Sequence, residues 1–140
     1  LMKIEAVKAG FSEAIALDVS GNLSEGTGEN LFAVKDDVVY TPPLSSSLLP
    51  GVTRATIMQF AKQAGHEVRE TNLPREMVYV ADELFFTGTA AEITPIRSVD
   101  KIQVANGKPG PVTLKFQKMF FDVVKNGNDK HNWLKFVYND

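Results

Sequence analysis

Three glycine-bearing loops carry the residues of this sequence whose types and spacing can support chemistry. The first loop, Ser20 to Asn30, holds three glycines and two carboxylates, Glu25 and Glu29. Glycine at this density indicates backbone that needs unusual dihedral angles or the close approach of a ligand. A carboxylate in such a loop can hold either a protonated ring nitrogen or a metal ion.

The second and third loops supply donors for an anion. Gly51-Val52-Thr53 stands immediately before a helical pattern. The free N–H groups at a helix start bind anions, phosphate above all. Thr87-Gly88-Thr89-Ala90 adds hydroxyl and N–H groups able to reach the same anion. Taken singly, each loop is a weak signal, because a simple chain reversal, an ordinary helix start or a capped turn explains its residues without any ligand.

The remaining reactive residue types are sparse. The sequence has no cysteine, which excludes a disulfide scaffold, a thiolate metal site and a cysteine nucleophile. His66 and His131 lie far apart in polar contexts, so we interpret both as surface residues. With no metal-ligand spacing among these residue types, we expect no metal site.

Composition limits the class of protein. The 140 residues are 44% hydrophobic and 23% charged, as in one globular domain with a substantial core. The net charge of -2 gives no basic excess, so we expect no nucleic acid and no membrane surface as partner. Because the sequence shows neither a signal peptide nor an apolar run near the ~20 residues of a membrane helix, we expect a cytoplasmic protein.

Alternating strand and helix patterns must position the three loops. Strands are predicted over Glu13–Val19, Leu31–Lys35, Val38–Thr41, Glu67–Asn72, Glu83–Phe86 and, in two pieces, Ile93–Val104. The second and third of these form a predicted hairpin with Asp36-Asp37 at its turn. Helices are predicted over Leu1–Ala9, Gly51–Ala64, Arg75–Ala81 and Val112–Lys125. The second helix has one apolar face, with Ile57, Phe60, Ala61 and Ala64, and Gly65 ends it. Interleaved elements of this kind predict an α/β or α+β domain with a mostly antiparallel sheet.

Four strings, taken in order, resemble one known family. They are Ser24-Glu25-Gly26-Thr27-Gly28-Glu29-Asn30-Leu31-Phe32, Thr41-Pro42-Pro43, Leu49-Pro50-Gly51-Val52-Thr53-Arg54 and Thr87–Ile96. Together they resemble the branched-chain amino-acid aminotransferases, pyridoxal-phosphate enzymes of the class IV (fold-type IV) group. The resemblance covers the whole chain, through Gly110–Thr113 to Trp133-Leu134. It implies that residues 1–140 are the C-terminal, cofactor-cradling domain, with a mostly antiparallel sheet or pseudo-barrel flanked by helices.

The resemblance implies a role for each cofactor-binding position. Glu25 would bind the pyridine nitrogen of pyridoxal 5'-phosphate, because a carboxylate favours the protonated ring. Leu49 would pack against the ring face. Val52 and Thr53 would donate backbone N–H groups to the phosphate, and Thr89 would bind the phosphate as well.

It implies substrate-binding positions too. The backbone groups of Thr89 and Ala90 would receive the substrate α-carboxylate, and Gly28 would line the substrate side, where a side chain would intrude. Glu29 would be a supporting polar residue nearby.

The family's Schiff-base lysine has no counterpart in these residues. By the family pattern it lies about ten residues upstream of Leu1, within one or two helical turns plus a strand end. Lys3 and Lys8 fall past that motif and lack its flanking residues. The small N-terminal domain, which supplies an arginine to the phosphate in the family, is missing as well. We therefore expect a domain fragment with no catalytic residue of its own, inactive by itself.

The resemblance implies amino-group transfer between leucine, isoleucine or valine and 2-oxoglutarate, in a homodimer or larger homo-oligomer. Two alternatives share the fold, a D-amino-acid aminotransferase and an aminodeoxychorismate lyase. The segment Gly110–Asn132 and the string Gly88–Glu92 favour the first interpretation over these. A third alternative is a non-catalytic domain that binds phosphate ligands.

Overall fold

A seven-stranded, largely antiparallel sheet forms the centre of the computed structural model, which describes residues 1–135. Its strands are β1 (Ile15–Leu17), β2 (Leu23–Gly26), β3 (Asn30–Lys35), β4 (Val38–Thr41), β5 (Val68–Glu70), β6 (Glu83–Gly88) and β7 (Glu92–Pro95). A separate two-stranded ribbon consists of β8 (Ser98–Val99) and β9 (Ile102–Gln103). The helices are α1 (Met2–Lys8), α2 (Val52–Gln63), α3 (Met77–Val80) and α4 (Pro111–Val124), with a 3-10 turn η1 (Leu44–Ser46).

Strand β3 lies in the middle of the sheet. It follows the first glycine-bearing loop in the chain and pairs with β6, which leads into the third. Along one edge it pairs with β6, and along the other it pairs with β2 at Asn30 and with β4 from Ala33 onward. The turn Asp36-Asp37 joins β3 to β4 with φ values of 50° and 63°. That geometry suits a two-residue hairpin, which confirms the predicted hairpin. Only β4 and β5 run parallel among the described strand pairs.

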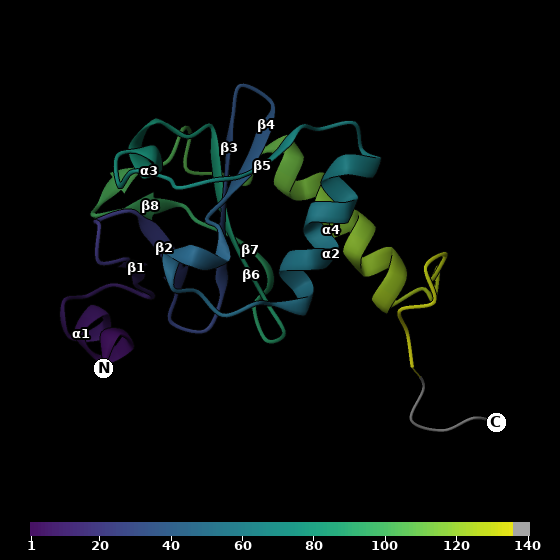
Figure 1. The fold of residues 1–140 in the computed structure, drawn as a ribbon, viewed down its shortest axis with the longest axis horizontal. Coiled ribbons are helices and arrows are strands. Elements are labelled where there is room, and N and C mark those ends of the chain that lie inside the picture. The colour runs from purple at the N-terminus through teal and green to yellow at the C-terminus, as the bar shows by residue number, and fades with distance from the viewer. Residues whose placement is uncertain (136–140) are drawn as a thin grey trace.

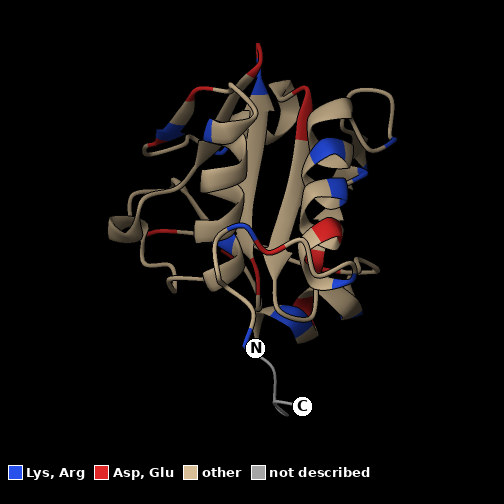
Figure 2. Cartoon of the chain, turned by 90° about the vertical axis from the view of Figure 1, so that its right-hand side faces the viewer, with Lys and Arg blue, Asp and Glu red and all other residues tan. Residues whose placement is uncertain are grey.

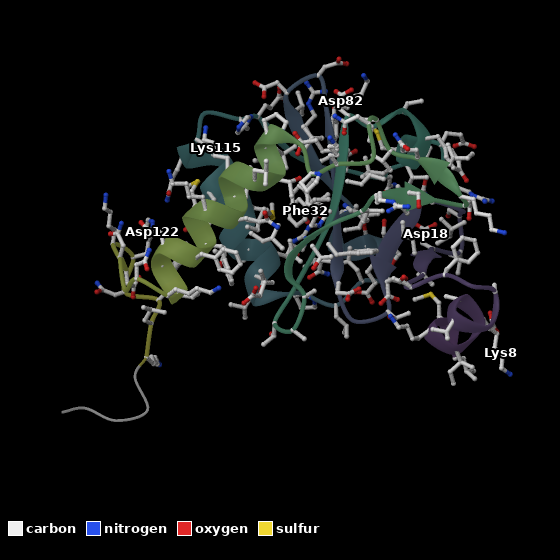
Figure 3. All side chains as sticks on the ribbon, turned by 180° about the vertical axis from the view of Figure 1, so that it is seen from behind. Lys8, Asp18, Phe32, Asp82, Lys115 and Asp122 are labelled. Carbon is white, nitrogen blue, oxygen red and sulfur yellow. The ribbon has the colours of Figure 1, made fainter. Side chains whose placement is uncertain are left out.

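Helices α2 and α4 cover one face of the sheet (Figure 1). Phe32 of β3 and Phe85 of β6 stack at 5.1 Å between ring centroids, and Phe116 of α4 meets Phe85 edge-on. Figure 3 shows Phe32 near the middle of the molecule, beside helix α4. The predicted apolar stripe of α2 is confirmed, because Ile57 and Phe60 are fully buried against this layer.

The opposite face of the sheet packs on α3 and its flanking loops. Leu31, Leu84, Leu73 and Val78 form this second core cluster. Helix α1 stands apart at the other end of the molecule from α2 and α4 (Figure 1) and has no buried residue. It leaves an apolar face exposed to solvent: Leu1, Ile4 and Val7.

Five predicted elements differ from the structure. The segment expected as a loop over Ser20–Asn30 contains strand β2, and the two strand pieces expected within Ile93–Val104 are three strands, β7, β8 and β9. The strand expected over Glu13–Val19 shrinks to β1, which is an edge strand with a single neighbour, so its side chains are half-buried or exposed rather than buried. The strand expected over Glu67–Asn72 is only β5, at the opposite edge. The helix expected over Arg75–Ala81 begins at Met77, because the preceding residues form a turn that the Met77 N–H closes on the Pro74 carbonyl.

His66 is not the surface residue that the sequence suggested. Gly65 turns the chain with a φ of +87°, and the His66 side chain then lies only 10% exposed, edge-on against Phe116. Its Nδ1 lies 3.0 Å from an oxygen of Asp37. His131 is exposed, as expected, and stacks on Trp133.

Basic and acidic residues are interspersed over the helices and loops (Figure 2). Within the part of the chain that the structure describes, no helix has the length and apolar character needed to cross a bilayer.

Candidate active site

The floor of a cleft consists of side chains from three adjacent strands, β2, β3 and β6. Glu25 of β2 lies opposite Asn30 of β3, which in turn lies opposite Thr87 of β6. Side chains directly opposite one another on antiparallel strands point to the same face of a sheet. Because Phe32 and Phe85 stand two residues further along and pack under the helices, Glu25, Asn30 and Thr87 face the helical side as well.

The loop before α2 forms the wall above this floor. A side-chain oxygen of Glu25, Oε2, accepts a hydrogen bond from the Leu49 N–H at 3.0 Å. Asn30 Nδ2 donates to the Leu49 carbonyl at 2.9 Å. Both backbone polar groups of Leu49 are therefore held by side chains of the floor, and the Leu49 side chain itself remains 74% exposed.

The N-terminus of α2 faces the same cleft and provides donors. Gly51 is the N-cap residue and supplies no side-chain cap, so the first N–H groups of the helix have no acceptor among residues 1–135. Val52 and Thr53 stand in the first turn and line the cleft. The positive end of the helix dipole adds to their attraction for an anion.

Arg54 stabilises the first turn of α2 through contacts outside the cleft. Its side chain is buried, its Nη2 donates to the Pro42 carbonyl at 2.9 Å, and the same atom lies 3.2 Å from Glu70 Oε1. This buried cation ties the start of α2 to the end of β4.

The third loop closes the cleft at the end of β6. A Cβ built on Gly88 would lie 3.2 Å from the Gly28 carbonyl oxygen, so the first and third loops are in contact. A Cβ on Gly28, by contrast, would meet nothing within 4 Å, which leaves open space on that side. Thr89 lines the cleft, and Ala90 follows it on an exposed turn outside the lining.

The cleft, with a volume of about 180 Å³, therefore brings together six of the seven cofactor- and substrate-binding positions that the resemblance implies, and the supporting residue Glu29 lines it as well. The six are Glu25, Gly28, Leu49, Val52, Thr53 and Thr89. Ala90 alone lies outside it.

Glu29 gives the cleft an unusual carboxyl group. Its Oε2 is buried and has no hydrogen-bond partner among residues 1–135. Burial, and next the charge of Glu13, raise the pKa of Glu29. Burial opposes ionisation of Glu13 too, but hydrogen bonds from Lys3, Thr27 and Ala14 outweigh it and lower the pKa of Glu13. The two neighbouring carboxyl groups are thus shifted in opposite directions, the pKa of Glu29 upward and the pKa of Glu13 downward.

Sequence reasoning missed three residues of this site: Asn30, Thr87 and Arg54. Thr87 is completely buried, and its hydroxyl has no partner in the described part of the chain. Asn30 and Thr87 are polar residues at inward positions of otherwise apolar strands. That pattern is the signal that marks them, since a buried polar side chain needs a partner.

Comparison with known proteins identifies the family. Residues 1–99 match the family model described as amino-transferase class IV. The chain belongs to the class IV aminotransferases. Over 135 residues it is 56% identical to the branched-chain-amino-acid aminotransferase of Escherichia coli (strain K12), an alignment that covers 96% of this chain and 44% of that relative. The chain thus spans less than half the length of the curated relatives it matches.

Solved structures confirm the fold of this class IV aminotransferase chain. A crystal structure of the Escherichia coli branched-chain amino acid aminotransferase matches with a TM-score of 0.96 and 55% identity, over 99% of this chain and 47% of that one. The T.th. branched-chain amino acid aminotransferase complexed with N-(5'-phosphopyridoxyl)-L-glutamate matches with a TM-score of 0.92 and 40% identity, over 98% and 47%. The predicted mixed fold is therefore that of the fold-type IV aminotransferases.

The residues present suit pyridoxal 5'-phosphate, the cofactor of class IV aminotransferases. The cleft combines a carboxylate, Glu25, with unpaired N–H donors at the start of α2. The buried Thr87 hydroxyl on its floor is a polar atom left without a partner by residues 1–135. A carboxylate at one place and a helix N-terminus at another match a ligand that carries a basic ring nitrogen and a phosphate.

Proposed function

We propose that this chain is the cofactor-binding domain of a branched-chain amino-acid aminotransferase. The enzyme would transfer amino groups between leucine, isoleucine or valine and 2-oxoglutarate. One observation carries the proposal: three loops far apart in sequence converge on one cleft, with Glu25 on its floor and the α2 N-terminus in its wall. The identity of 56% to enzymes named for this activity supports the choice of substrate class.

Glu25 would hold a proton at the ring nitrogen of the cofactor. When bound, pyridoxal 5'-phosphate supplies an electron-withdrawing ring that takes up charge as the substrate loses its α-proton. Glu25 favours that protonated ring, because an adjacent carboxylate raises the pKa of a nitrogen base. The Leu49 N–H already occupies Oε2 of Glu25, which leaves Oε1 for the ring. The exposed Leu49 side chain would cover one ring face.

The phosphate would bind at the start of α2. The N–H groups of Val52 and Thr53 would donate to it, and Thr89 would add its hydroxyl from the third loop. Arg54 would contribute charge without contact, since its guanidinium is turned to the Pro42 carbonyl and Glu70.

The substrate would enter beside Gly28 and the third loop. The backbone N–H groups of Thr89 and Ala90 would bind its α-carboxylate, and the open space beside Gly28 would admit the rest of the molecule. The Schiff-base lysine and an arginine for the phosphate would come from the part of the relatives' length that this chain does not match.

The complete enzyme would be a cytoplasmic homodimer or larger homo-oligomer. The exposed apolar face of α1 supports association, because contiguous apolar surface favours contact with another chain or domain. Light scattering on the natural protein would measure its mass in solution.

A visible spectrum of the natural full-length protein tests the proposed activity. We expect a yellow absorption band that L-leucine abolishes and the 2-oxo acid 2-oxoglutarate restores. A response to D-alanine but not to L-leucine would instead indicate a D-amino-acid aminotransferase. Release of pyruvate from aminodeoxychorismate would indicate the lyase. Phosphate binding without any visible band would favour a non-catalytic domain.

A further inference from the structure

We propose that Asn30 is a positioning residue that clamps the backbone of Leu49 and thereby fixes the orientation of Glu25. The proposal rests on the proposed function of the cleft and adds to it the residues that hold its ring-binding end in place. Asn30 itself does not touch the reacting atoms.

The clamp is visible in the hydrogen bonds of Leu49. Its carbonyl accepts from Asn30 Nδ2 at 2.9 Å, and its N–H donates to Glu25 Oε2 at 3.0 Å. The side chain of Leu49 is 74% exposed, so packing contributes little to its placement. These two bonds to neighbouring strands are what place Leu49 over the floor.

Asn30 is a rigid anchor for this purpose. It is buried at 5% exposure and pairs with Glu25 on one side and Thr87 on the other, in the middle of the sheet. Its side-chain amide therefore holds the Leu49 backbone at a fixed position relative to the sheet. If Leu49 moved, Glu25 would lose the donor that fixes Oε2. Its other oxygen, Oε1, would then no longer be held in the orientation proposed for binding the ring nitrogen.

Gly51 shows how closely the clamp fits. A Cβ built on Gly51 would overlap Asn30 Oδ1 and lie 3.3 Å from Asn30 Cγ. The backbone of Gly51, at φ -101° and ψ 137°, is open to any residue, so the requirement for glycine is steric. The next neighbour, Arg54 Cβ, is at an ordinary contact distance of 3.5 Å. Shortening Asn30 to alanine would therefore make room for a methyl group at position 51.

This pairing predicts a specific mutant cycle. Asn30→Ala and Gly51→Ala should each loosen Leu49, one by deleting the amide and the other by displacing it. The double variant should be no looser than Asn30→Ala alone, because the overlap is already gone. Residues that share one contact show such non-additivity, whereas independent sites add.

The first measurement needs no cofactor. Hydrogen exchange, followed by mass spectrometry on a peptide that spans residues 45–51 of the natural apo protein, reports the Leu49 N–H. We expect exchange to accelerate about three- to tenfold in each single variant, the scale of one hydrogen bond. Asn106→Ala, at an exposed turn remote from the cleft, is the matched control and should leave this peptide unchanged.

The second measurement separates positioning from general loosening of the cofactor site. Because the clamp acts at the ring end, Asn30→Ala should weaken pyridoxal 5'-phosphate and phosphate-free pyridoxal by the same factor, about three- to tenfold. The ratio of the two dissociation constants should stay at the wild-type value. A changed ratio would mean that Asn30 acts on the phosphate end instead, and would overturn the proposal.

Additive effects in the double variant, or unchanged exchange in both single variants, would also overturn it. Should Asn30→Ala fail to fold, Asn30→Asp keeps the size and removes the Nδ2 donor, so it must accelerate exchange in the same peptide. Failure of the proposed function looks different: wild-type protein would bind neither form of the cofactor, while the exchange results would still support the clamp.

Discussion

Glu83 holds the first turn of α4, and its replacement by glutamine gives the sharpest stability prediction. Glu83 stands at the start of β6 and is buried at 6% exposure. Oε1 accepts from the Val112 N–H at 2.9 Å, and Oε2 accepts from the Thr113 N–H at 2.8 Å and from Thr113 Oγ1 at 2.7 Å. A single carboxylate thus caps the helix and joins it to the strand that carries Thr87.

The cost of Glu83→Gln follows from counting these partners. Glutamine has one acceptor oxygen, which can keep the two bonds from Thr113. Its NH₂ group then faces the Val112 N–H, and a buried donor left without an acceptor costs about 1–3 kcal/mol. The lost attraction between the carboxylate and the helix dipole adds about 0.3–2 kcal/mol. We therefore expect the free energy of unfolding to fall by about 1–5 kcal/mol.

Urea unfolding followed by circular dichroism measures this loss. Glu76→Gln is the matched control, because Glu76 is an exposed carboxylate without a side-chain cap bond and should change stability by less than about 0.5 kcal/mol. Gly110→Ala offers a second route to the same contact, since a Cβ there would overlap the Glu83 carboxyl group. A Glu83→Gln midpoint equal to that of the control would refute the capping argument.

Two further predictions concern the phosphate end and pH. Thr89→Val should weaken cofactor binding about tenfold, and Thr53→Val should weaken it less, because Thr53 would act through its backbone N–H. Fluorescence titration would measure both dissociation constants. Equal, negligible effects of the two substitutions would count against the phosphate site. Hydrogen bonds from Tyr79 and then Arg75 lower the pKa of Asp100. The ionised carboxylate therefore stabilises the fold above its unfolded pKa, and this contribution disappears as pH falls through the folded value. Asp100→Asn should lower the free energy of unfolding at pH 7, by less than about 1 kcal/mol for this half-exposed group, and leave it unchanged in strong acid; urea unfolding at both pH values would measure this.

Local patterns predicted the elements that depend on local forces. The α2 helix followed from its apolar spacing and from the glycines at both ends, and the hairpin from two aspartates between apolar runs. The positions that the resemblance assigns to the cofactor came from the strings shared with a family, and the structure gathers all of them into one cleft.

Contacts between residues far apart in the sequence account for the features that could not be predicted. Asn30 and Thr87 are 57 positions apart and become neighbours only through the register of β3 and β6. Glu83 caps a helix whose first residues lie 29 and 30 positions away. The burial of His66 likewise depends on its contact with Phe116 of α4, which the polar residues next to His66 in the sequence do not predict.

Glu25 provides the most direct test of the central claim, that this cleft holds the cofactor ring for transamination. Stopped-flow mixing of the natural protein with L-leucine would follow the loss of the yellow band in wild type and in Glu25→Gln. The variant keeps an acceptor for the Leu49 N–H but removes the charge that holds a proton on the ring. We predict a fall of about 100-fold or more in this rate, the scale of a lost electrostatic contact to the reacting system, with the cofactor dissociation constant changed by less than about tenfold. A Glu25→Gln protein that reacts with leucine at the wild-type rate would contradict the account.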